Sequence, residues 1–544
     1  MGKKLWCFCF FILLFGGTLM TMLGIELPNV DLNGVYTDEN IVLSPVGDSV
    51  DEIMNGSYMQ TIEKKYESIY ALRAPMIKLN NTIDFLLGRS ANENVWLLGN
   101  YNLFEEHYLL DVTVSNDSMD GLKNRNAIHT QVSELAYVRS CLSNLGIESY
   151  VFITPNKACY YMDDVRQTAL YKTGKSASGE GVRNIDILRE ELRMQDIPFT
   201  DSSFIIQNGK LPAQVTPFVR SGIHYTWAAG YYLMAELFND IEQTLHVDMP
   251  EFVIRIEESN EVVFPNSDLY ELQNTYQFIT DYFYADIVQQ IPYADSLISV
   301  PTKVFVQGGS FLGPMIDFVI RYPDAFVWMD IVQNNFCYGH NQQYTLNAIS
   351  DIDIKSVLSS NLVIFEVCED KALGMSFGFI DHLADYFRSI GDESLDNLVD
   401  YPHELKINQQ WINANAAVSY GIYFDAVDMG WSFTRKRFGC MLQDEEIGQK
   451  GLIVRTTVLP QLIEQAPDGI VQAHFFINQV DVGTYSVSND GIIAIPANQI
   501  PVDENGIYSI DVEVNSSFIP SELDSASFDS RELSLILISI SANE

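Results

Sequence analysis

One apolar run that ends in two glycines and a serine constrains this chain more than any other feature. Val304-Phe305-Val306 is typical of a buried strand, and Gln307-Gly308-Gly309-Ser310-Phe311 follows it directly. A serine at such a strand-to-helix turn exposes its hydroxyl among backbone N–H groups, which is the setting of a nucleophile. A serine here also suits the cap of a helix that begins near Leu312, so both interpretations stay open.

A histidine upstream is the candidate base for this serine. His224 stands in the run Gly222-Ile223-His224-Tyr225, just before a helix predicted from Trp227 to His246. An imidazole ionises near neutral pH and can take a hydroxyl proton; the alternative is a surface or helix-capping histidine. No aspartate lies within three residues of His224, so the sequence leaves the residue that orients it unidentified.

Strands and helices alternate through the middle of the chain. Strands are predicted at 95–99, 150–154, 204–206, 304–306 and 362–365, and helices at 58–87, 126–145, 186–195, 227–246, 311–321 and 378–390. This alternation predicts an α/β domain, an SGNH-hydrolase-like mainly parallel sheet flanked by helices. After Pro402, short strands are separated by Gly, Asn, Asp and Pro, which predicts a C-terminal antiparallel β-sandwich.

A chain of 544 residues is too long for one ordinary core, so several domains are expected. The predicted segments are an N-terminal membrane anchor or signal segment (1–24), a spacer with a helical lead-in (25–90), the α/β domain (91–402) and the β-sandwich (403–544). The last is the candidate carbohydrate-binding domain.

The N-terminal segment contains an uncharged apolar run from Leu5 to Gly24, preceded by Lys3 and Lys4. About 20 apolar residues suffice to span a bilayer as a helix, and the lysines favour the cytoplasmic side. We therefore expect a single uncleaved anchor in the cell membrane, with the bulk of the chain on the extracytoplasmic side. The alternative is a cleaved signal peptide and a secreted protein, although a small-residue cleavage site is hard to find.

Charge and cysteine usage exclude several classes of function. The formal net charge is -40, from 72 acidic and 32 basic residues, and such a chain repels nucleic acids and anionic lipid surfaces. It favours a neutral or cationic polymer as partner. The seven cysteines form no Cys-x-x-Cys pair, so we expect isolated thiols, no metal site and no disulfide scaffold. No cofactor is expected.

Four polar residues follow predicted strands of the α/β domain. Asn156 and Lys157 follow the strand 150–154, and Glu366 and Glu369 follow the strand 362–365. Open α/β sheets bind ligands at the carboxyl ends of their strands, so these residues are expected to line the cleft; the alternative for the glutamates is an exposed loop pair. Gly308, Gly309 and Tyr225 complete the predicted lining.

The C-terminal segment offers candidate contacts to a glycan. These are Trp411, Trp431, Arg435 and Arg437, the last two flanking Lys436. Aromatic rings and guanidinium groups suit sugar faces and carboxylates. The alternatives are core or inter-domain packing for the tryptophans and a solvated strand edge for the basic residues.

Five motifs occur in an order that resembles a known family. They are Asn94–Gly99 with Asn102–Glu105, Tyr150–Ala158 ending in Thr-Pro-Asn-Lys-Ala, Gly222–Gly230 around His224, Gln307–Phe311 around Ser310, and Phe365–Glu369. Together they resemble the AlgX/AlgJ-like family of SGNH-hydrolase-like polysaccharide O-acetyltransferases, over about residues 55 to 390. Two positions depart from the family pattern. Gly222 replaces an aspartate two residues before the histidine, and Cys368 stands where a polar residue such as asparagine is expected.

The resemblance implies acetyl transfer to a polysaccharide in two steps. His224 would deprotonate Ser310, Ser310 would take the acetyl group, N–H groups around Gly309 and Ser310 would hold the oxyanion, and a sugar hydroxyl would then accept the acetyl. A membrane-bound O-acyltransferase would supply acetyl groups from the membrane. The orienting acid would come from elsewhere than position 222. Two alternatives stay open: a carbohydrate esterase with the same residues, and a non-catalytic polysaccharide-binding or assembly protein.

Overall fold

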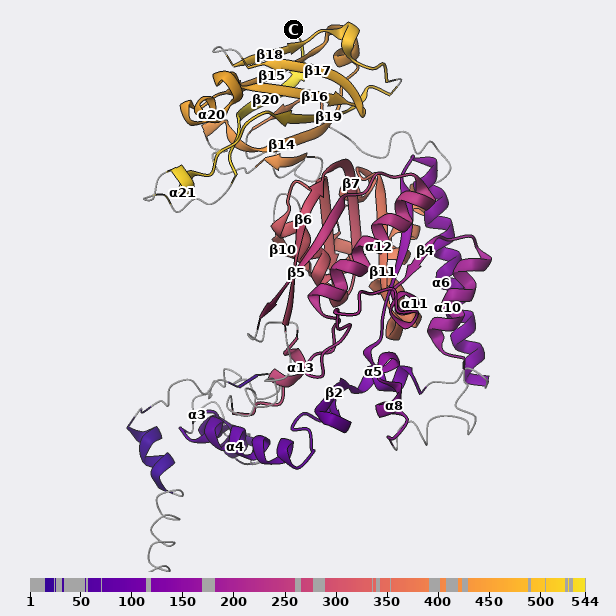
Figure 1. Ribbon diagram of the computed structural model, residues 1–544, viewed down its shortest axis with the longest axis vertical. Coiled ribbons are helices and arrows are strands. Elements are labelled where there is room, and N and C mark those ends of the chain that lie inside the picture. Colours follow the sequence, from indigo (N-terminus) through magenta and orange to yellow (C-terminus); the bar gives the residue numbers. More distant parts are fainter. Residues whose placement is uncertain are drawn as a thin grey trace, which may run out of the picture.

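The computed structural model describes residues 15–23, 25, 32–33, 54, 57–69, 71–113, 119–168, 182–259, 266–276, 289–334, 336–338, 343–352, 354–390, 402–407, 419–422, 429–487, 491–503, 505–523, 527 and 532–543. Three parts follow one another along the long axis of the molecule (Figure 1). N-terminal helices lie at one end, an α/β part in the middle, and a β-sheet part at the other end.

A seven-stranded sheet forms the centre of the α/β part. Its order is β10 (Gln343–Thr345), β9 (Phe336–Tyr338), β8 (Phe326–Gln333), β7 (Val300–Gly308), β11 (Leu362–Cys368), β3 (Glu148–Thr154) and β4 (Phe199–Asp201). The five strands from β8 to β4 are parallel, and β9 and β10 add an antiparallel edge. The predicted mainly parallel sheet is therefore confirmed.

Both faces of this sheet are covered, which explains why its strands are apolar on every side. Val304 and Val306 pack with α12 (Trp227–Leu245) and α15 (Gly313–Arg321) on one face. Phe305 packs on the other face with α6 (Met119–Asn144), α10 (Asn184–Met194) and α17 (Phe379–Ile390). Successive side chains of a strand point to opposite faces, so one run supplies both cores. Smaller helices are α5 (Glu106–Asp111), α7 (Lys157–Tyr160), α8 (Met162–Val165) and α16 (Ile354–Leu358).

Several features of this part were not predicted correctly. The sheet strands β4, β8, β9 and β10 were not expected from the sequence. The expected strand at 204–206 is a helix, α11 (Ser202–Gln207), because the Asp201 carboxylate accepts from Phe204 N at 3.3 Å and so caps a helical first turn. An antiparallel hairpin of β5 (Glu251–Ser259) and β6 (Gln289–Ile298) lies between α12 and β7. The short helix α13 (Asp268–Glu271) lies between these two strands in the chain, and its position decides the composition of the site.

The C-terminal part is a largely antiparallel sheet. Its main path is β17 (Val480–Ser486), β16 (Gln472–Ile477), β19 (Ile507–Val514), β14 (Ser432–Gln443), β20 (Ile536–Ala542), β15 (Leu452–Thr457) and β18 (Ile492–Ile495), with β12 (Leu405–Lys406) and β13 (Ser419–Ile422) beside it. β14 pairs with β20 through Ser432 and Phe433 and with β19 from Arg437 onward. It therefore joins the strands β17, β16 and β19 to the strands β20, β15 and β18. The antiparallel pairing agrees with the prediction, while a division into two packed sheets stays a prediction.

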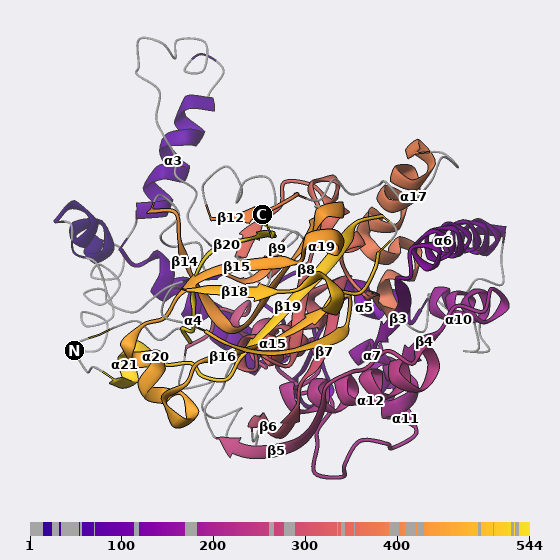
Figure 2. The same cartoon turned by 90° about the horizontal axis from the view of Figure 1, so that it is seen from above.

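The C-terminal sheet attaches at the amino end of β7. The Lys303 Nζ donates to Ser509 Oγ at 2.7 Å and lies 3.4 Å from Asp511 Oδ1. Seen from above, the C-terminal strands lie over the central sheet, with α6, α10 and α17 to one side (Figure 2). Because Ser310 follows the opposite end of β7, about seven residues or 20 Å of strand separate it from this junction.

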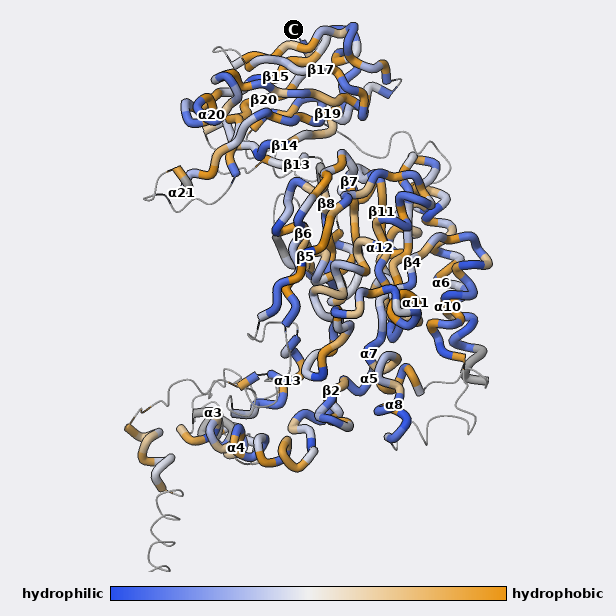
Figure 3. The backbone as a smooth tube through the Cα atoms, viewed as in Figure 1, coloured by the Kyte–Doolittle hydropathy of each residue, from blue (hydrophilic) through white to orange (hydrophobic). Residues whose placement is uncertain are grey.

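The N-terminal part contains a helical stretch at 15–22, α3 (Ser57–Ile69) and α4 (Arg73–Leu86). Apolar segments are prominent in it (Figure 3). Most of the predicted anchor, Leu5–Gly24, lies outside the described residues. Among those that are described, no helix is both long and apolar enough to cross a membrane.

Candidate active site

The serine singled out from the sequence stands at the end of β7, where the short helix η4 (Ser310–Leu312) begins. Its side chain is exposed, whereas Phe311 and Leu312 beside it are buried. The Ser310 Oγ lies 2.7 Å from His224 Nε2, within hydrogen-bonding distance. The structure therefore brings together the two residues that the sequence proposed as nucleophile and base.

Gly308 is required by the packing of the turn. A Cβ atom at this position would lie 2.5 Å from both Cβ and Oε2 of Glu366 on the neighbouring strand β11. The glycine thus lets the Glu366 side chain pass directly under the nucleophile turn.

Hydrogen bonds hold the loop around His224, residues 222–226 and hereafter the histidine loop, on both sides of His224. Thr226 caps α12 by accepting from Ala229 N at 3.2 Å, and its own hydroxyl donates to Thr216 O at 2.7 Å. The His224 ring packs against that of Phe311, with centroids 4.9 Å apart. Cap and ring contact together fix where the imidazole points.

Asp268 is the acid that sequence reasoning did not find. Its Oδ2 lies 2.6 Å from His224 Nδ1, and its Oδ1 accepts from Ile223 N at 3.0 Å and from Leu269 N at 2.7 Å. Both carboxylate oxygens are therefore occupied, which holds the carboxylate toward the ring. Asp268 comes 44 residues after His224, at the start of α13, so the acid expected at position 222 is supplied by a separate element.

The three side chains form a row of acid, imidazole and hydroxyl. Such a row can hold one tautomer of the imidazole, with Nδ1–H donated to the carboxylate and the Nε2 lone pair directed at the hydroxyl. The His224 and Asp268 side chains are 14% and 13% exposed, so the pair is shielded while the serine is open. The geometry fits proton removal from Ser310 by His224.

A pocket of about 210 Å³ opens over this serine. It is lined by Glu105, His107, Tyr108, Gly309, Ser310, Phe311, Asn334, Glu366, Val367, Cys368, Asp370, Lys371, Ser376 and Phe377. Of the residues predicted to line the cleft, Gly309 and Glu366 do so. Gly308, Asn156, Lys157, Tyr225 and Glu369 lie outside this lining.

The predicted role of the Gly309 N–H as an oxyanion donor is contradicted by its hydrogen bond. This N–H donates to Glu366 Oε2 at 2.6 Å, and Thr154 Oγ1 donates to the other oxygen of the same carboxyl group. Burial raises the pKa of Glu366 to about 7, although both hydrogen bonds oppose the rise. Glu366 therefore ties the carboxyl ends of β3, β7 and β11 together instead of facing an oxyanion.

Asn334 is a pocket residue that the sequence did not suggest. It follows β8, has a left-handed backbone with φ of 53°, and donates its N–H to Gly308 O at 2.8 Å. Its neighbour Gln333 donates Nε2 to Ser310 O at 3.2 Å. These bonds hold the exposed Asn334 amide beside the nucleophile turn, where it is a candidate oxyanion donor together with the Ser310 N–H.

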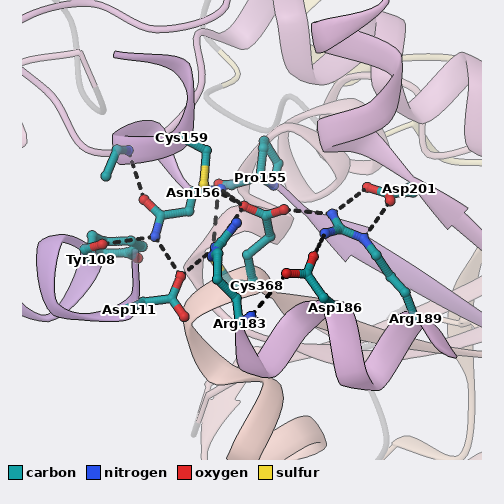
Figure 4. Close-up of polar contacts among 12 residues, drawn as sticks. Tyr108, Asp111, Pro155, Asn156, Cys159, Arg183, Asp186, Arg189, Asp201 and Cys368 are labelled. Atoms are coloured by element: carbon teal, nitrogen blue, oxygen red, sulfur yellow. Dashed lines mark hydrogen bonds and ion pairs between the residues drawn. The ribbon is translucent and has the colours of Figure 1, made fainter. Parts of the chain in front are cut away.

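Glu369 belongs to a buried charge network and not to the cleft. Figure 4 shows the other members of this network, Arg183, Arg189, Asp111 and Asp201. Its carboxylate contacts Arg189 Nη2 at 2.6 Å and Arg183 Nη2 at 3.4 Å, and the two guanidinium groups continue to Asp201 and Asp111. Burial would raise the pKa of Glu369, but the two guanidinium groups outweigh it, so the pKa falls below its usual value. The network is a structural element beneath the sheet edge.

Asn156 and Lys157 also act behind the site. The Asn156 side chain caps α7 through Ala158 N at 2.7 Å and donates to Tyr108 O and Asp111 Oδ2, both at 3.0 Å. Lys157 is fully buried, and its Nζ donates to three backbone carbonyls: Gly222 O at 2.6 Å, Leu103 O at 2.7 Å and Arg220 O at 3.1 Å. Since Gly222 is two residues before His224, Lys157 holds the histidine loop from below.

Tyr225 is buried and donates its hydroxyl to Phe311 O, so it joins the histidine loop to the nucleophile turn. Burial raises its pKa well above the usual value, so it stays a neutral phenol. It is a positioning residue and does not face the pocket.

Three of the proposed glycan contacts, Trp431, Arg435 and Arg437, lie in or directly before β14 of the C-terminal sheet, which attaches at the far end of β7 from Ser310. Trp431 packs edge-on against Phe433, with centroids 5.5 Å apart, and Arg437 pairs with Glu513 at 3.4 Å. The basic side chains of 435–437 lie near Asp324 of the α/β part. Arg437 and Glu513 also line an inter-domain cavity of about 110 Å³. Trp411 lies outside the described residues.

The five cysteines that the structure describes are free thiols, and three of them, Cys337, Cys368 and Cys440, are buried. Within the same residues, no group of three or more histidine, cysteine, aspartate or glutamate side chains is arranged to hold a metal ion.

No protein-family model matches the chain, and no curated protein matches its sequence. Among solved structures, the O-acetyltransferase domain of Pseudomonas putida AlgJ covers 54% of this chain and 99% of its own length, at 15% identity and a TM-score of 0.35. Pseudomonas aeruginosa AlgX covers 85% and 97%, at 12% identity and a TM-score of 0.34. Bacillus cereus PatB1 covers 47% and 93%, at 11% identity and a TM-score of 0.31. AlgJ and AlgX, after which the family that the motifs resemble is named, are thus among the solved structures to which this chain is similar.

Proposed function

We propose that this protein is an O-acetyltransferase that acetylates a polysaccharide through an acetyl-serine intermediate on Ser310. The observation that carries the proposal is the row Ser310–His224–Asp268, with contacts of 2.7 and 2.6 Å, at the base of an open pocket. A non-catalytic scaffold has no need for an exposed serine aligned with an oriented imidazole.

The first half-reaction loads the enzyme. His224 takes the Ser310 proton as Oγ attacks the carbonyl carbon of an acetyl donor, and Asp268 stabilises the resulting imidazolium. The imidazolium then gives this proton to the leaving group of the donor. The developing oxyanion is held by the Ser310 N–H and the Asn334 amide, since Glu366 occupies the Gly309 N–H.

The second half-reaction transfers the acetyl group from Ser310 to the sugar. A sugar hydroxyl attacks the acetyl carbonyl carbon while His224 takes the hydroxyl proton, and the proton returns to Ser310 Oγ as the ester bond breaks. If water attacks instead, the same residues form a carbohydrate esterase. The transferase is the better-supported reading because the five motifs resemble an O-acetyltransferase family.

The donor follows from the same resemblance, and the location follows from the N-terminal apolar run. We propose a membrane-bound O-acyltransferase as the source of acetyl groups, because acetyl-CoA is not present outside the cell. The N-terminal apolar run would anchor the chain in the cell membrane with its bulk on the extracytoplasmic side.

The test is to incubate the full-length protein with p-nitrophenyl acetate, with and without an oligosaccharide, and to measure released nitrophenolate, acetate and acetylated sugar. We expect a burst of nitrophenolate and a mass increase of one acetyl group on the peptide with Ser310. Ser310→Ala and His224→Ala are expected to abolish both. An unmodified Ser310 and a burst unaffected by Ser310→Ala would disprove the acetyl-enzyme. If acetate is released and no added oligosaccharide ever receives an acetyl group, the protein is a carbohydrate esterase.

A further inference from the structure

A second histidine–carboxylate pair lines the Ser310 pocket. His107 of α5 has its Nε2 3.3 Å from Asp370 Oδ2, at the start of η6 (Glu369–Gly378), and both residues line the pocket. The His107 side chain is 44% exposed and that of Asp370 only 1%. This exposed imidazole lies at an ion-pair distance from a buried carboxylate, whereas His224 and Asp268 share a hydrogen bond of 2.6 Å. The mechanism above uses neither His107 nor Asp370.

The buried Asp370 carboxylate, at an ion-pair distance from Nε2, and the ring of Tyr108 together place the His107 imidazole. Burial would raise the pKa of Asp370, but contacts from His107, Cys368 and Lys371 outweigh it and lower the pKa, so the group stays ionised. The His107 ring also stacks on Tyr108, with centroids 4.2 Å apart. With Nε2 directed at Asp370, Nδ1 is the nitrogen left to a ligand, since Glu105 Oε2 at 3.7 Å is beyond hydrogen-bonding distance.

The charge of this side of the pocket is negative. Asp370 and Glu105 carry this charge. Glu366 also lines the pocket, but its pKa is about 7 and both of its oxygens accept hydrogen bonds from Gly309 and Thr154. Lys371 is the lysine of the lining and already lies 3.3 Å from Asp370. Burial, and then the nearby carboxylates of Asp268 and Asp370, raise the pKa of Glu105 despite the opposing histidines. A sugar that carries a carboxylate would meet like charges in a partly dry site.

We propose that His107, oriented by Asp370, is the acceptor subsite of the pocket, and that it binds a hydroxyl of a neutral or amine-bearing sugar in preference to a uronate. The inference rests on the proposed function and specifies its acceptor. The sugar hydroxyl donates to His107 Nδ1, and Glu105 accepts from a second hydroxyl or an ammonium group. No covalent step involves His107, because the acceptor proton passes to His224.

The test separates the two half-reactions in the full-length protein. Nitrophenolate bursts report loading, and acetyl transfer to neutral, amine-bearing and uronate oligosaccharides of equal length reports the acceptor. In His107→Gln we expect a burst within about twofold of wild type and transfer reduced by about tenfold through a higher KM for the acceptor, the effect of one hydrogen bond. In Glu105→Gln, use of the uronate acceptor is expected to rise.

His129→Gln is the matched control, because His129 of α6 forms a similar pair with Glu191 at 2.9 Å outside the pocket. Transfer by this control should be unchanged. The inference is overturned if His107→Gln leaves transfer intact, if burst and transfer fall together, or if wild type prefers the uronate. If the wild-type protein shows no burst of nitrophenolate, the proposed function itself is disproved, and this inference, which rests on it, fails as well.

An independent observation concerns helix α4, whose buried side contains two polar residues beside Phe85 and whose exposed side is apolar. Its polar residues Asn81 and Thr82 are buried: Asn81 Nδ2 donates to Gln273 O and Thr82 Oγ1 accepts from Tyr276 N, both at 3.0 Å. Its apolar residues form an exposed stripe, between 47% and 65% accessible, made of Met76, Leu79, Ile83, Leu86 and Leu87. Residues at this spacing share one side of a helix.

The surroundings of the stripe indicate what covers it. The helical stretch 15–22 exposes Phe15, Leu19 and Met22 and contacts the chain two residues before α4, where Ala71 N donates to Thr21 Oγ1 at 2.9 Å. The uncharged run from Leu5 continues directly into that stretch. From position 73 to 89 the sequence has three basic residues and one acidic residue, in a chain whose net charge is -40. We infer that α4 lies on a phospholipid bilayer with this stripe inserted at the interface.

Photo-crosslinking to lipid tests this inference. The full-length protein would be reconstituted in phosphatidylcholine vesicles that contain a phospholipid with a photoreactive acyl chain, and adducts would be mapped by mass spectrometry. We expect adducts at Met76, Leu79 and Ile83. Val253 and Ile298 of the β5–β6 hairpin are each 61% exposed and serve as controls that should stay unmodified. Adducts confined to the residues before 25, or equally frequent at the controls, would overturn the inference.

Discussion

At the residue scale, Asp268 decides whether His224 can act as a base. Asp268→Asn keeps the size of the side chain but removes the charge that stabilises the imidazolium, and its amide can select the wrong tautomer. We expect the rate of Ser310 acetylation to fall by about 10³-fold or more, with little change in folding. Stopped-flow bursts and thermal unfolding of the same preparation check this. A loss below about tenfold would mean that another group orients the ring.

Glu366 gives a prediction about pH. A carboxyl whose pKa is raised on folding, here from 4.5 to about 7, stabilises the fold below the unfolded pKa and loses that contribution as pH rises through the folded value. Glu366→Gln mimics the protonated form and does not titrate. Urea unfolding between pH 4 and 8 should therefore show wild type losing up to about 3 kcal/mol relative to this variant, at about 1.4 kcal/mol per pKa unit. A pH-independent difference contradicts the prediction.

The serine and its histidine could be proposed from sequence, because each follows a local pattern of strand, glycine and helix start. Asp268 could not, because its partner lies 44 residues away and the short run Asn266-Ser267-Asp268 has no property that links it to position 224. Glu369 and Lys157 were misassigned for a related reason. A polar residue after a strand points to the sheet edge, but only packing decides whether it faces solvent or a buried partner.

At the element scale, α7 supports the histidine loop through one buried ammonium group. Lys157→Met preserves the length and apolar stem of the side chain and leaves the carbonyls of Leu103, Arg220 and Gly222 without this donor. We expect a loss of about 3 kcal/mol or more in unfolding free energy, since each unpaired buried group costs about 1 to 3 kcal/mol. Burst amplitude should fall as well. Chemical denaturation measures the first effect; a variant as stable as wild type would show that the loop does not depend on Lys157.

Elements with a long helical period or a continuous apolar run were predicted well, as α12 and the strands β3, β7 and β11 show, whereas β4 and β8 of the same sheet were missed. α11 was not, since an apolar run of three residues fits a strand or a helix turn equally, and the Asp201 cap decided it. β14 was missed because its twelve residues include Arg435, Lys436 and Arg437, which interrupt the apolar alternation. The β5–β6 hairpin was missed as well, although it carries the chain toward Asp268.

At the scale of the whole molecule, the Ser310 pocket and the C-terminal sheet lie at opposite ends of β7. We therefore expect Trp431→Ala and Arg437→Ala to leave turnover of p-nitrophenyl acetate within about twofold of wild type, as is usual for substitutions remote from a site. Acetylation of a long polysaccharide could still depend on them. Steady-state assays with the small ester provide the check, and a large loss there would mean that the two parts are coupled through the Lys303 junction.

The contact between Gly308 and Glu366 has a consequence for how such sequences diverge. Because a methyl group at 308 would occupy the space of the glutamate side chain, the two positions are expected to change together among descendants of a common ancestor. A homologue with alanine at 308 should have lost the carboxylate at 366, and Thr154 should then be free to vary, since its hydroxyl donates to that carboxylate. Inherited covariation at these three positions would be the evolutionary trace of a single buried side chain.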